Sequence, residues 1–105
     1  MTPAPPRVYD AIAHPTRRRI LHLLDAEEMS VNDLAGRFPV TRPAISQHLG
    51  ALRQAGLVEH RKVGRVRYYR ARTEPLREIV DWLSHFDAFW DEKLAALTHH
   101  LSENP

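Results

Sequence analysis

The chain has 105 residues, of which 43% are hydrophobic and 27% charged, a composition that predicts one globular domain and excludes an intrinsically disordered body. The absence of cysteine excludes disulfide bonds, thiolate zinc sites and cysteine nucleophiles, and the absence of a long apolar run excludes a transmembrane helix, so we expect a cytoplasmic protein. The net charge is only +2, but residues 1–72 carry thirteen Lys and Arg against six Asp and Glu, and this excess favours a polyanionic partner.

The first quarter of the chain predicts a tail and two helices. Three prolines within residues 1–6 indicate a disordered tail with little to bury. The apolar residues over 8–12 favour a short helix. Pro15 disfavours helical geometry at the residue before it and suits the first turn of a second helix, which we expect over residues 16–25.

The next two helices are separated by a tight turn. Ser30, followed three residues later by Asp33, predicts the capped start of a short helix that runs to residue 37. A second helix is expected over residues 41–55, with its first residue as N-cap and Gly56 as a left-handed C-cap. Two short helices joined in this way are the outline of a helix-turn-helix.

On a helical wheel, residues 41–55 separate into an aliphatic face and a polar face without Glu or Lys. Arg, Ser and Gln are side chains that read base edges in a major groove, Arg on guanine and Gln on adenine. A merely solvated helix would be expected to carry Glu and Lys there, so we favour direct DNA contact. The predicted DNA contacts of this helix are Thr41, Arg42, Pro43, Ser46, Gln47 and Arg53.

After Gly56 the pattern becomes extended and basic. Residues 57–63 and 66–71 predict two strands, and Gly64-Arg65 between them fits a two-residue turn. We expect Arg65 and Arg67 of this 58–71 wing to contact DNA, Arg65 at a narrow minor groove or at phosphate. For the other wing cations the alternative is a solvated edge that is kept charged to prevent strand-to-strand aggregation. These other cations include Arg61, Lys62 and Arg70.

The last segment predicts one long amphipathic helix over residues 75–101. Its apolar residues recur every three or four positions, and at 1.5 Å per residue the stretch from Leu76 to Leu101 would be roughly 39 Å long. The rest of the chain is too small to cover that length of apolar surface, so we expect a second copy of the chain to cover the remainder. The predicted dimer contacts are Leu76, Ile79, Leu83, Phe86, Trp90, Leu94 and Leu97.

Three features of the sequence have more than one interpretation. For His48, on the inward half of the 41–55 helix, we favour a buried, hydrogen-bonded imidazole over a phosphate contact or a base reader. Asp87 lies inside the apolar stripe, where a carboxylate needs an arginine partner or a wet edge, the alternative being an effector contact. Aromatic residues at helical spacing favour plain packing over a ligand pocket; they are Trp82, Phe86, Phe89 and Trp90.

Four fragments of the chain occur in a particular order. They are His14-Pro15-Thr16-Arg17-Arg18-Arg19-Ile20-Leu21, Ile45-Ser46-Gln47-His48-Leu49, Leu52-Arg53-Gln54-Ala55-Gly56-Leu57-Val58, and Gly64-Arg65 followed by Tyr68-Tyr69. In this order they resemble the ArsR-type winged helix-turn-helix repressors. The resemblance covers roughly residues 7–101 and implies a mainly α domain with a small β-hairpin and a dimerisation helix over 75–101, with 102–105 as a tail. It also implies a homodimer that binds a palindromic operator in double-stranded DNA and represses transcription until a signal releases it.

The metal-sensing patterns of that family are incomplete in this chain. Where arsenic-type and cadmium-type sensors place Cys-x-Cys before Asp-Leu-Ala, this chain has Ser30-Val31-Asn32, and serine and asparagine are poor ligands for soft metals. The zinc pattern of the final helix keeps Asp87, His100 and Glu103 but has Phe89 in place of a histidine. We therefore predict no metal site and no cofactor, and the inducer stays unidentified.

These observations predict a sequence-specific DNA-binding transcriptional regulator, a dimeric repressor that uses the 41–55 helix and the 58–71 wing. The alternative is a protein-interaction adaptor built on a winged helix, whose DNA binding would be weak and insensitive to salt. An enzyme is not expected, because Ser46 and His48 point to different sides of one helix and no carboxylate pair or glycine-rich phosphate loop occurs.

Overall fold

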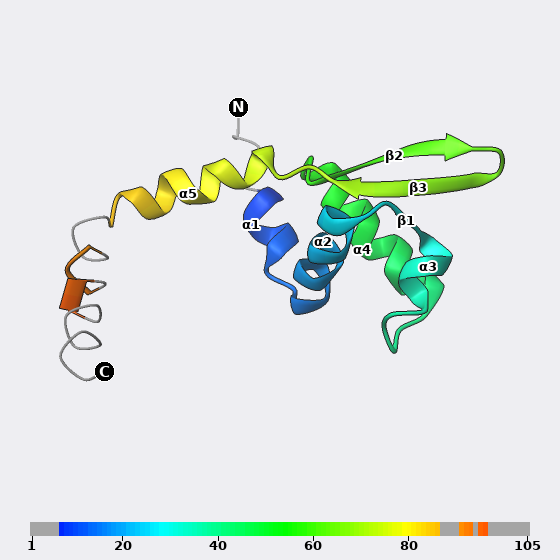
Figure 1. Ribbon diagram of the computed structural model, residues 1–105, viewed down its shortest axis with the longest axis horizontal. Coiled ribbons are helices and arrows are strands. Elements are labelled where there is room, and N and C mark those ends of the chain that lie inside the picture. The colour runs from blue at the N-terminus through cyan, green and yellow to red at the C-terminus, as the bar shows by residue number, and fades with distance from the viewer. Residues whose placement is uncertain (1–6, 87–90, 94, 97–105) are drawn as a thin grey trace, which may run out of the picture.

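The computed structural model describes residues 7–86, 91–93, 95 and 96. Helices α1 to α4 form a packed body, from which a β-hairpin projects on one side and α5 leaves on the other (Figure 1). The fold is mainly α-helical with one small antiparallel sheet, as predicted. The elements are α1 (Arg7–Ile12), α2 (Pro15–Ala26), β1 (Met29–Ser30), α3 (Val31–Ala35), α4 (Arg42–Gln54), β2 (Val58–Val63), β3 (Val66–Ala71), the 3-10 turn η1 (Glu74–Leu76) and α5 (Arg77–Ser84).

Several parts of the sequence-based interpretation lie outside this description. The predicted tails at 1–6 and 102–105 are among the residues that the structure does not describe. Of the residues discussed for metal binding, Asp87, Phe89, His100 and Glu103 also lie outside it. Across the described ranges, no helix is long and apolar enough to cross a membrane.

Local capping contacts set the starts of α3 and α4, as predicted. The Ser30 hydroxyl accepts a hydrogen bond from the Asp33 N–H at 3.1 Å, and the Asp33 carboxylate accepts one from the Ser30 N–H at 3.0 Å. At α4 the Thr41 hydroxyl accepts from the Ala44 N–H at 3.3 Å. These side chains satisfy backbone donors that the first turn of a helix leaves free. The end of α3 comes at Ala35, two residues earlier than the predicted residue 37.

The end of α4 is set by Gly56, which has a φ of 76°. The Gly56 N–H donates to the Arg53 carbonyl and the Leu57 N–H donates to the Leu52 carbonyl, both at 2.9 Å. This pattern is a Schellman motif, in which glycine adopts the left-handed conformation at low cost. It turns the chain directly from α4 into β2, so the predicted C-cap is confirmed.

The hydrophobic core lies where α2, α3 and α4 meet beneath the sheet. Each fully buried aliphatic side chain contributes about 1.5–3 kcal/mol relative to exposure, so the inward stripe of α4 holds this helix firmly against the body. That stripe consists of Ile45, Leu49 and Leu52, each at most 1% exposed. The other fully buried large side chains are Ile20, Leu34 and Leu57.

The sheet has the strand order β1-β3-β2, with both pairings antiparallel. The hairpin β2–β3 was predicted, and Gly64 in its turn has a positive φ of 64°. The two-residue strand β1 was not predicted, because so short a stretch has no alternation to detect. In it, Met29 lies opposite Tyr69 and Ser30 opposite Tyr68, which ties the start of α3 to the middle of β3.

The prediction of one helix from Leu76 to Leu101 was wrong in its extent. Leu76 belongs to η1, and α5 ends at Ser84. The Ser84 hydroxyl donates to the Asp81 carbonyl at 2.6 Å, and the N–H groups of His85 and Phe86 bond three residues back, so the regular helical pattern stops there. Residues 91–93, 95 and 96 are again helical.

The predicted dimer contacts therefore fall into three groups. Leu76 and Ile79 are half-buried and pack against the core of their own chain. Leu83 on α5 and Phe86, two residues beyond the end of α5, are exposed. Trp90, Leu94 and Leu97 lie outside the described residues.

Candidate nucleic-acid interface

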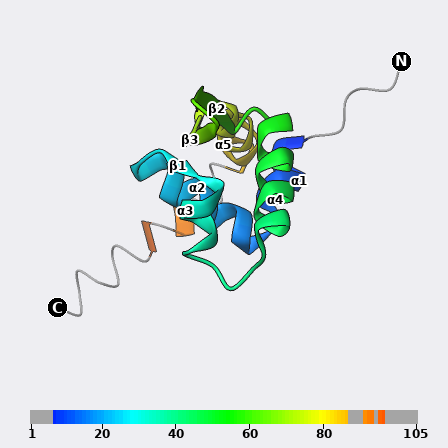
Figure 2. The ribbon, with the colours of Figure 1, turned by 90° about the vertical axis from the view of Figure 1, so that its right-hand side faces the viewer.

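The N-cap and the outward face of α4 carry all the DNA contacts that the sequence predicted for this helix. Because the aliphatic stripe faces the core, the polar side chains are left on the surface. Figure 2, in which the hairpin tip points toward the viewer, shows α3 and α4 on the same side of the molecule as the hairpin. The exposed residues are Thr41, Arg42, Pro43, Ser46, Gln47 and Arg53.

A polar cleft joins α4 to the wing. It has a volume of about 390 Å³ and brings Ser46 of α4 together with Arg65 and Arg67 of the hairpin, three residues that the sequence placed at the site. The other polar lining residues include Asn32 on α3, which the sequence did not indicate, and Lys62 on β2, for which a solvated edge was the alternative. The full lining is Ser30, Val31, Asn32, Ser46, Lys62, Arg65, Val66, Arg67 and Tyr69.

The register of the hairpin separates its cations onto two faces. Because directly opposed residues point to the same side of an antiparallel pair, Lys62 shares a face with Arg67, and Arg61 shares the other face with Tyr68. Only the first of these pairs lines the cleft with Ser46. We call the face with Lys62 and Arg67 the inner wing face, and the face with Arg61 and Arg70 the outer wing face.

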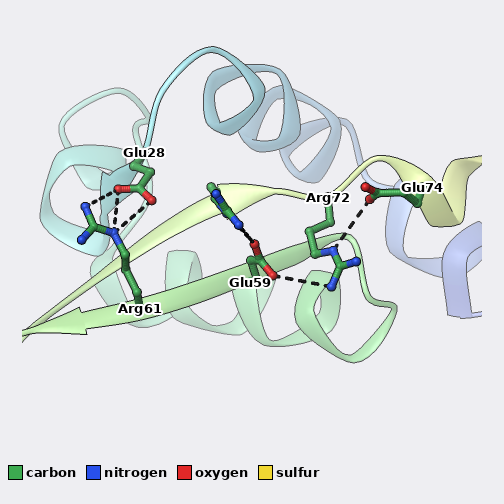
Figure 3. Close-up of polar contacts among 6 residues, drawn as sticks. Glu28, Glu59, Arg61, Arg72 and Glu74 are labelled. Atoms are coloured by element: carbon green, nitrogen blue, oxygen red, sulfur yellow. Dashed lines mark hydrogen bonds and ion pairs between the residues drawn. The ribbon is translucent and has the colours of Figure 1, made fainter.

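Carboxylates neutralise the cations of the outer wing face (Figure 3). Arg61 donates to both carboxylate oxygens of Glu28, with a closest separation of 2.8 Å, and Arg70 donates to Glu59. At the base of the hairpin, Arg72 lies 3.5 Å from Glu59 and 3.7 Å from Glu74.

The hydrogen bond from Arg61 lowers the pKa of the Glu28 carboxyl, so this ion pair persists at neutral pH. Within the described ranges, Lys62, Arg65 and Arg67 have no such ion pair. The uncompensated positive charge of the wing therefore lies at its tip and on the inner wing face, toward α4.

His48 is a hydrogen-bonded imidazole on the flank of α4, as favoured from the sequence, although it is half-buried rather than fully buried. Arg17 donates through Nε to its Nδ1 at 3.1 Å, and the ring of His14 lies 6.2 Å away. Burial, followed by the positive charges of Arg17 and His14, lowers the pKa of His48. The neutral form, which can accept from Arg17, is thereby favoured.

His60 is a second half-buried imidazole, placed where the inner wing face approaches α4. Its ring packs edge-on against Tyr69 at 5.2 Å, and its Nδ1 has no hydrogen-bond partner among the described residues. Burial lowers its pKa, with smaller contributions from Arg53 and Arg67. Arg53 and Arg67 are both predicted DNA contacts, so the pKa of His60 depends on the charge of the proposed DNA-binding surface.

Arg18 and Arg19, which follow Arg17 in the first turns of α2, both contact other parts of the same chain. Arg18 donates to the Ile12 carbonyl at 2.7 Å, which ties α2 to the end of α1. The guanidinium of Arg19 lies over the ring of Phe38, 4.9 Å from its centroid, and so contacts the turn between α3 and α4. In the part of the chain that the structure covers, no group of His, Asp and Glu is arranged to hold a metal ion.

Arg42, at the start of α4, has a neutral partner on α3. Its Nη1 donates to the Oδ1 of Asn32 at 2.7 Å. No local pattern predicts this contact, because it joins residues ten positions apart on two different helices. Lys62 was detectable in principle, because a two-residue turn at Gly64-Arg65 places it opposite Arg67.

The chain is similar to known helix-turn-helix proteins and transcriptional regulators. A family model described as a helix-turn-helix domain matches residues 12–61. The transcriptional repressor SdpR of Bacillus subtilis is 38% identical over 79 residues, covering 75% of this chain and 88% of that protein. The HTH-type transcriptional regulator Rv2034 of Mycobacterium tuberculosis is 37% identical over 91 residues, covering 87% and 82%.

The fold of this chain is also similar to the folds of solved regulator structures. The solved structure of an ArsR-like transcriptional regulator from Rhodococcus sp. RHA1 superposes with a TM-score of 0.73 and 39% sequence identity, covering 94% of this chain and 91% of that one. A second structure, of a possible transcriptional regulator for arsenical resistance, has a TM-score of 0.69 and 43% identity over 92% of this chain.

Proposed function

The chain belongs to the ArsR family of helix-turn-helix transcriptional regulators and is a DNA-binding regulator of transcription, and we propose that it acts as a homodimeric repressor on a palindromic operator. The observation that carries this proposal is the cleft between α4 and the wing. There, Ser46 of α4 shares one concave surface with Lys62, Arg65 and Arg67, whose charges no carboxylate of the described residues compensates.

In the proposed complex, α4 enters the major groove. Arg42, Ser46 and Gln47 read base edges, and the neighbouring contacts Thr41, Pro43 and Arg53 lie along the rim of the groove. Rigid packing of the aliphatic stripe supports this role, because a reading helix that moved on the body would lose its register with the bases.

The wing lies against the flanking backbone in this arrangement. Arg65 at the hairpin tip meets phosphate or a narrow minor groove, while Lys62 and Arg67 face the phosphates beside α4. Neutralisation of the outer wing face by Glu28 and Glu59 supports this orientation, because the attraction for a polyanion then acts from one side of the hairpin only.

A second copy of the chain would cover the apolar face that α5 exposes. Val80 and Leu83, which are 62% and 39% exposed, lie three positions apart on one side of α5. Trp82 is 52% exposed but lies on another side of the helix, where it packs edge-on against Tyr9 of the same chain. An exposed apolar strip of this kind is typical of a protein interface. Two-fold symmetry then places inverted half-sites about 34–36 Å apart, one helical turn of DNA, or a multiple of that distance.

The experiment is selection of bound sequences from random duplexes, followed by affinity measurement over a range of salt concentrations. The proposal predicts an enriched inverted repeat, and a log affinity that falls by about 0.9 per phosphate contact for each log unit of salt. An adaptor without specific DNA binding would give no enriched sequence and no salt dependence. The selected duplex can then be challenged with zinc and candidate small molecules to look for an inducer.

Variants of the proposed base readers add a second test. Arg42→Ala and Gln47→Ala should each cost about 1–3 kcal/mol on the selected duplex and relax the sequence preference. Arg65→Ala should weaken binding to every duplex alike if the guanidinium meets phosphate. Equal losses on selected and random duplexes for all three variants would refute this division of roles.

A further inference from the structure

The partner of Arg42 indicates how its side chain is prepared for a base edge. We infer that Asn32 is a positioning residue, which holds the Arg42 guanidinium beside the cleft through the hydrogen bond from Nη1 to its Oδ1 at 2.7 Å. This inference rests on the proposed function, since it assigns a specificity role to a residue of the same DNA-reading surface. Asn32 would act through Arg42 and not by recognising a base itself.

Asn32 lies on a part of the backbone that several contacts hold in place. It is the second residue of α3, and the capping box formed by Ser30 and Asp33 surrounds it in the sequence. Leu34 of the same helix is fully buried, and β1 ties the start of α3 to β3. The amide of Asn32 therefore projects from a helix that is held at its start and on its inner face.

The chemical nature of the acceptor distinguishes Arg42 from the arginines of the outer wing face. Arg61, Arg70 and Arg72 all meet carboxylates, which cancel much of their charge toward an incoming polyanion. Arg42 instead meets a neutral amide oxygen, and it has no ion pair among the described residues. An amide restricts the rotamer of the guanidinium and leaves its positive charge available.

A held arginine improves recognition because arginine has a long side chain with many rotamers. Ordering such a side chain on binding costs about 0.5–1.5 kcal/mol, which corresponds to roughly twofold to tenfold in affinity. The donor that bonds Asn32 occupies one end of the guanidinium, while its other N–H groups stay free for the two acceptors of a guanine edge. Removing Asn32 should therefore reduce sequence preference by about that factor.

The test is a double-mutant cycle on the selected duplex and on a shuffled duplex. Asn32→Ala should lower the preference for the selected duplex by about twofold to tenfold in the wild-type background, and should have no effect in the Arg42→Ala background. The matched control is the Gln47→Ala background. Gln47 is a second proposed base reader and has no hydrogen bond to Asn32, so Asn32→Ala should there cost its full wild-type factor.

A second substitution tests whether the acceptor at position 32 must be uncharged, or whether any oxygen there is sufficient. Asn32→Asp keeps an oxygen in place but adds a carboxylate, which would pair with Arg42 as Glu28 pairs with Arg61. It should weaken binding more in the wild-type background than in the Arg42→Ala background. Equal losses in the two backgrounds would mean that the added charge repels DNA on its own, and would contradict the idea that neutrality at Asn32 serves Arg42.

The outcomes distinguish this inference from the proposed function. If Asn32→Ala costs the same preference with and without Arg42, or costs nothing in either background, the positioning role is wrong while DNA reading by α4 stands. If Arg42→Ala itself leaves the preference unchanged, Arg42 does not read a base, and the proposed role of Arg42 and the positioning role of Asn32 are both wrong. Thermal unfolding of each variant checks that α3 still folds, as expected for alanine at an exposed helical position.

Discussion

His48 and His60 couple the stability of this domain to pH. Both are half-buried beside the proposed DNA-reading surface, and in both burial is the main cause of a lowered pKa. Neighbouring cations add to the effect, with Arg17 acting on His48 and Arg53 on His60. Each imidazole is therefore kept neutral in the folded chain at pH values where it would begin to charge in the unfolded chain.

The consequence is a loss of stability in mild acid. Below the unfolded value of about 6.5 the unfolded chain binds more protons than the folded chain, so the free energy of unfolding should fall as pH decreases from 7.5 to 5. Glu28 titrates below this window, because its pKa is lowered from an already acidic value. Urea unfolding at a series of pH values measures the effect, and His48→Gln, which keeps an acceptor for Arg17, should make the dependence shallower. An unchanged dependence in this variant would show that His48 does not contribute.

The two faces of the wing make different predictions for single cations. Lys62→Ala or Arg67→Ala should each reduce the salt dependence of DNA binding by about one phosphate contact, a slope change near 0.9. Arg61→Ala is the matched control, because its charge is paired with Glu28 on the outer wing face. Fluorescence anisotropy at several salt concentrations gives the slopes. A slope loss for Arg61→Ala as large as that for Lys62→Ala would contradict the assignment of faces.

For single residues, the sequence predicted which side chains are exposed, but it did not predict which side chains bond to each other. The exposure of Arg42, Ser46 and Gln47 follows from the helical period alone. The contact of Arg42 with Asn32 depends on how two helices pack, and no local pattern encodes it. Arg61 resembles Arg67 in the sequence, and only the hairpin register and the position of Glu28 separate their roles.

At the scale of elements, glycines at two positions of the α4 region should respond in opposite ways to alanine. Gly50 lies inside α4, and a Cβ there meets no heavy atom within 4 Å, so Gly50→Ala should stabilise the fold by about 0.5–1 kcal/mol. Gly56 has a positive φ, so Gly56→Ala should destabilise it by about 1–2 kcal/mol. Urea unfolding of both variants measures the difference. Destabilisation by Gly50→Ala would contradict the helical assignment, and a neutral Gly56→Ala would contradict the left-handed cap.

The elements with strong local signals were the ones that the sequence predicted. Ser30, Thr41 and Gly56 each act within a few residues, so the bounds of α3 and α4 were close to those observed. Strand β1 depends on pairing with β3, which is distant in the chain, and was missed. The end of α5 depends on side-chain competition at Ser84, while the apolar period that suggested a longer helix continues past it.

At the scale of the whole molecule, the basic body and the acidic last third have separate proposed roles. The body offers cations on one side, at α4 and the inner wing face. Residues 73–105 carry two Lys and Arg against seven Asp and Glu, and α5 exposes an apolar strip. Such a segment would repel DNA and favour a partner helix, which fits the proposal that it pairs two DNA-reading surfaces.

The proposed dimer can be disrupted on α5 without touching α4. Leu83→Asp would place a carboxylate in the apolar strip, so we expect a monomer at micromolar concentration and a large loss of affinity for a two-half-site duplex. Asp81→Asn, an exposed change on the same helix, is the matched control and should stay dimeric. Light scattering gives the mass of each variant. A dimer that survives Leu83→Asp would show that this strip is not the interface.

The most direct test of the central claim is a hydroxyl-radical footprint of the wild-type protein on the selected duplex. The claim is that two copies of α4 and its inner wing face read one stretch of DNA from the same side. It predicts two symmetric protected half-sites whose centres lie about one helical turn, 34–36 Å, or a multiple of it apart. A single protected site, or uniform protection along the duplex, would contradict it.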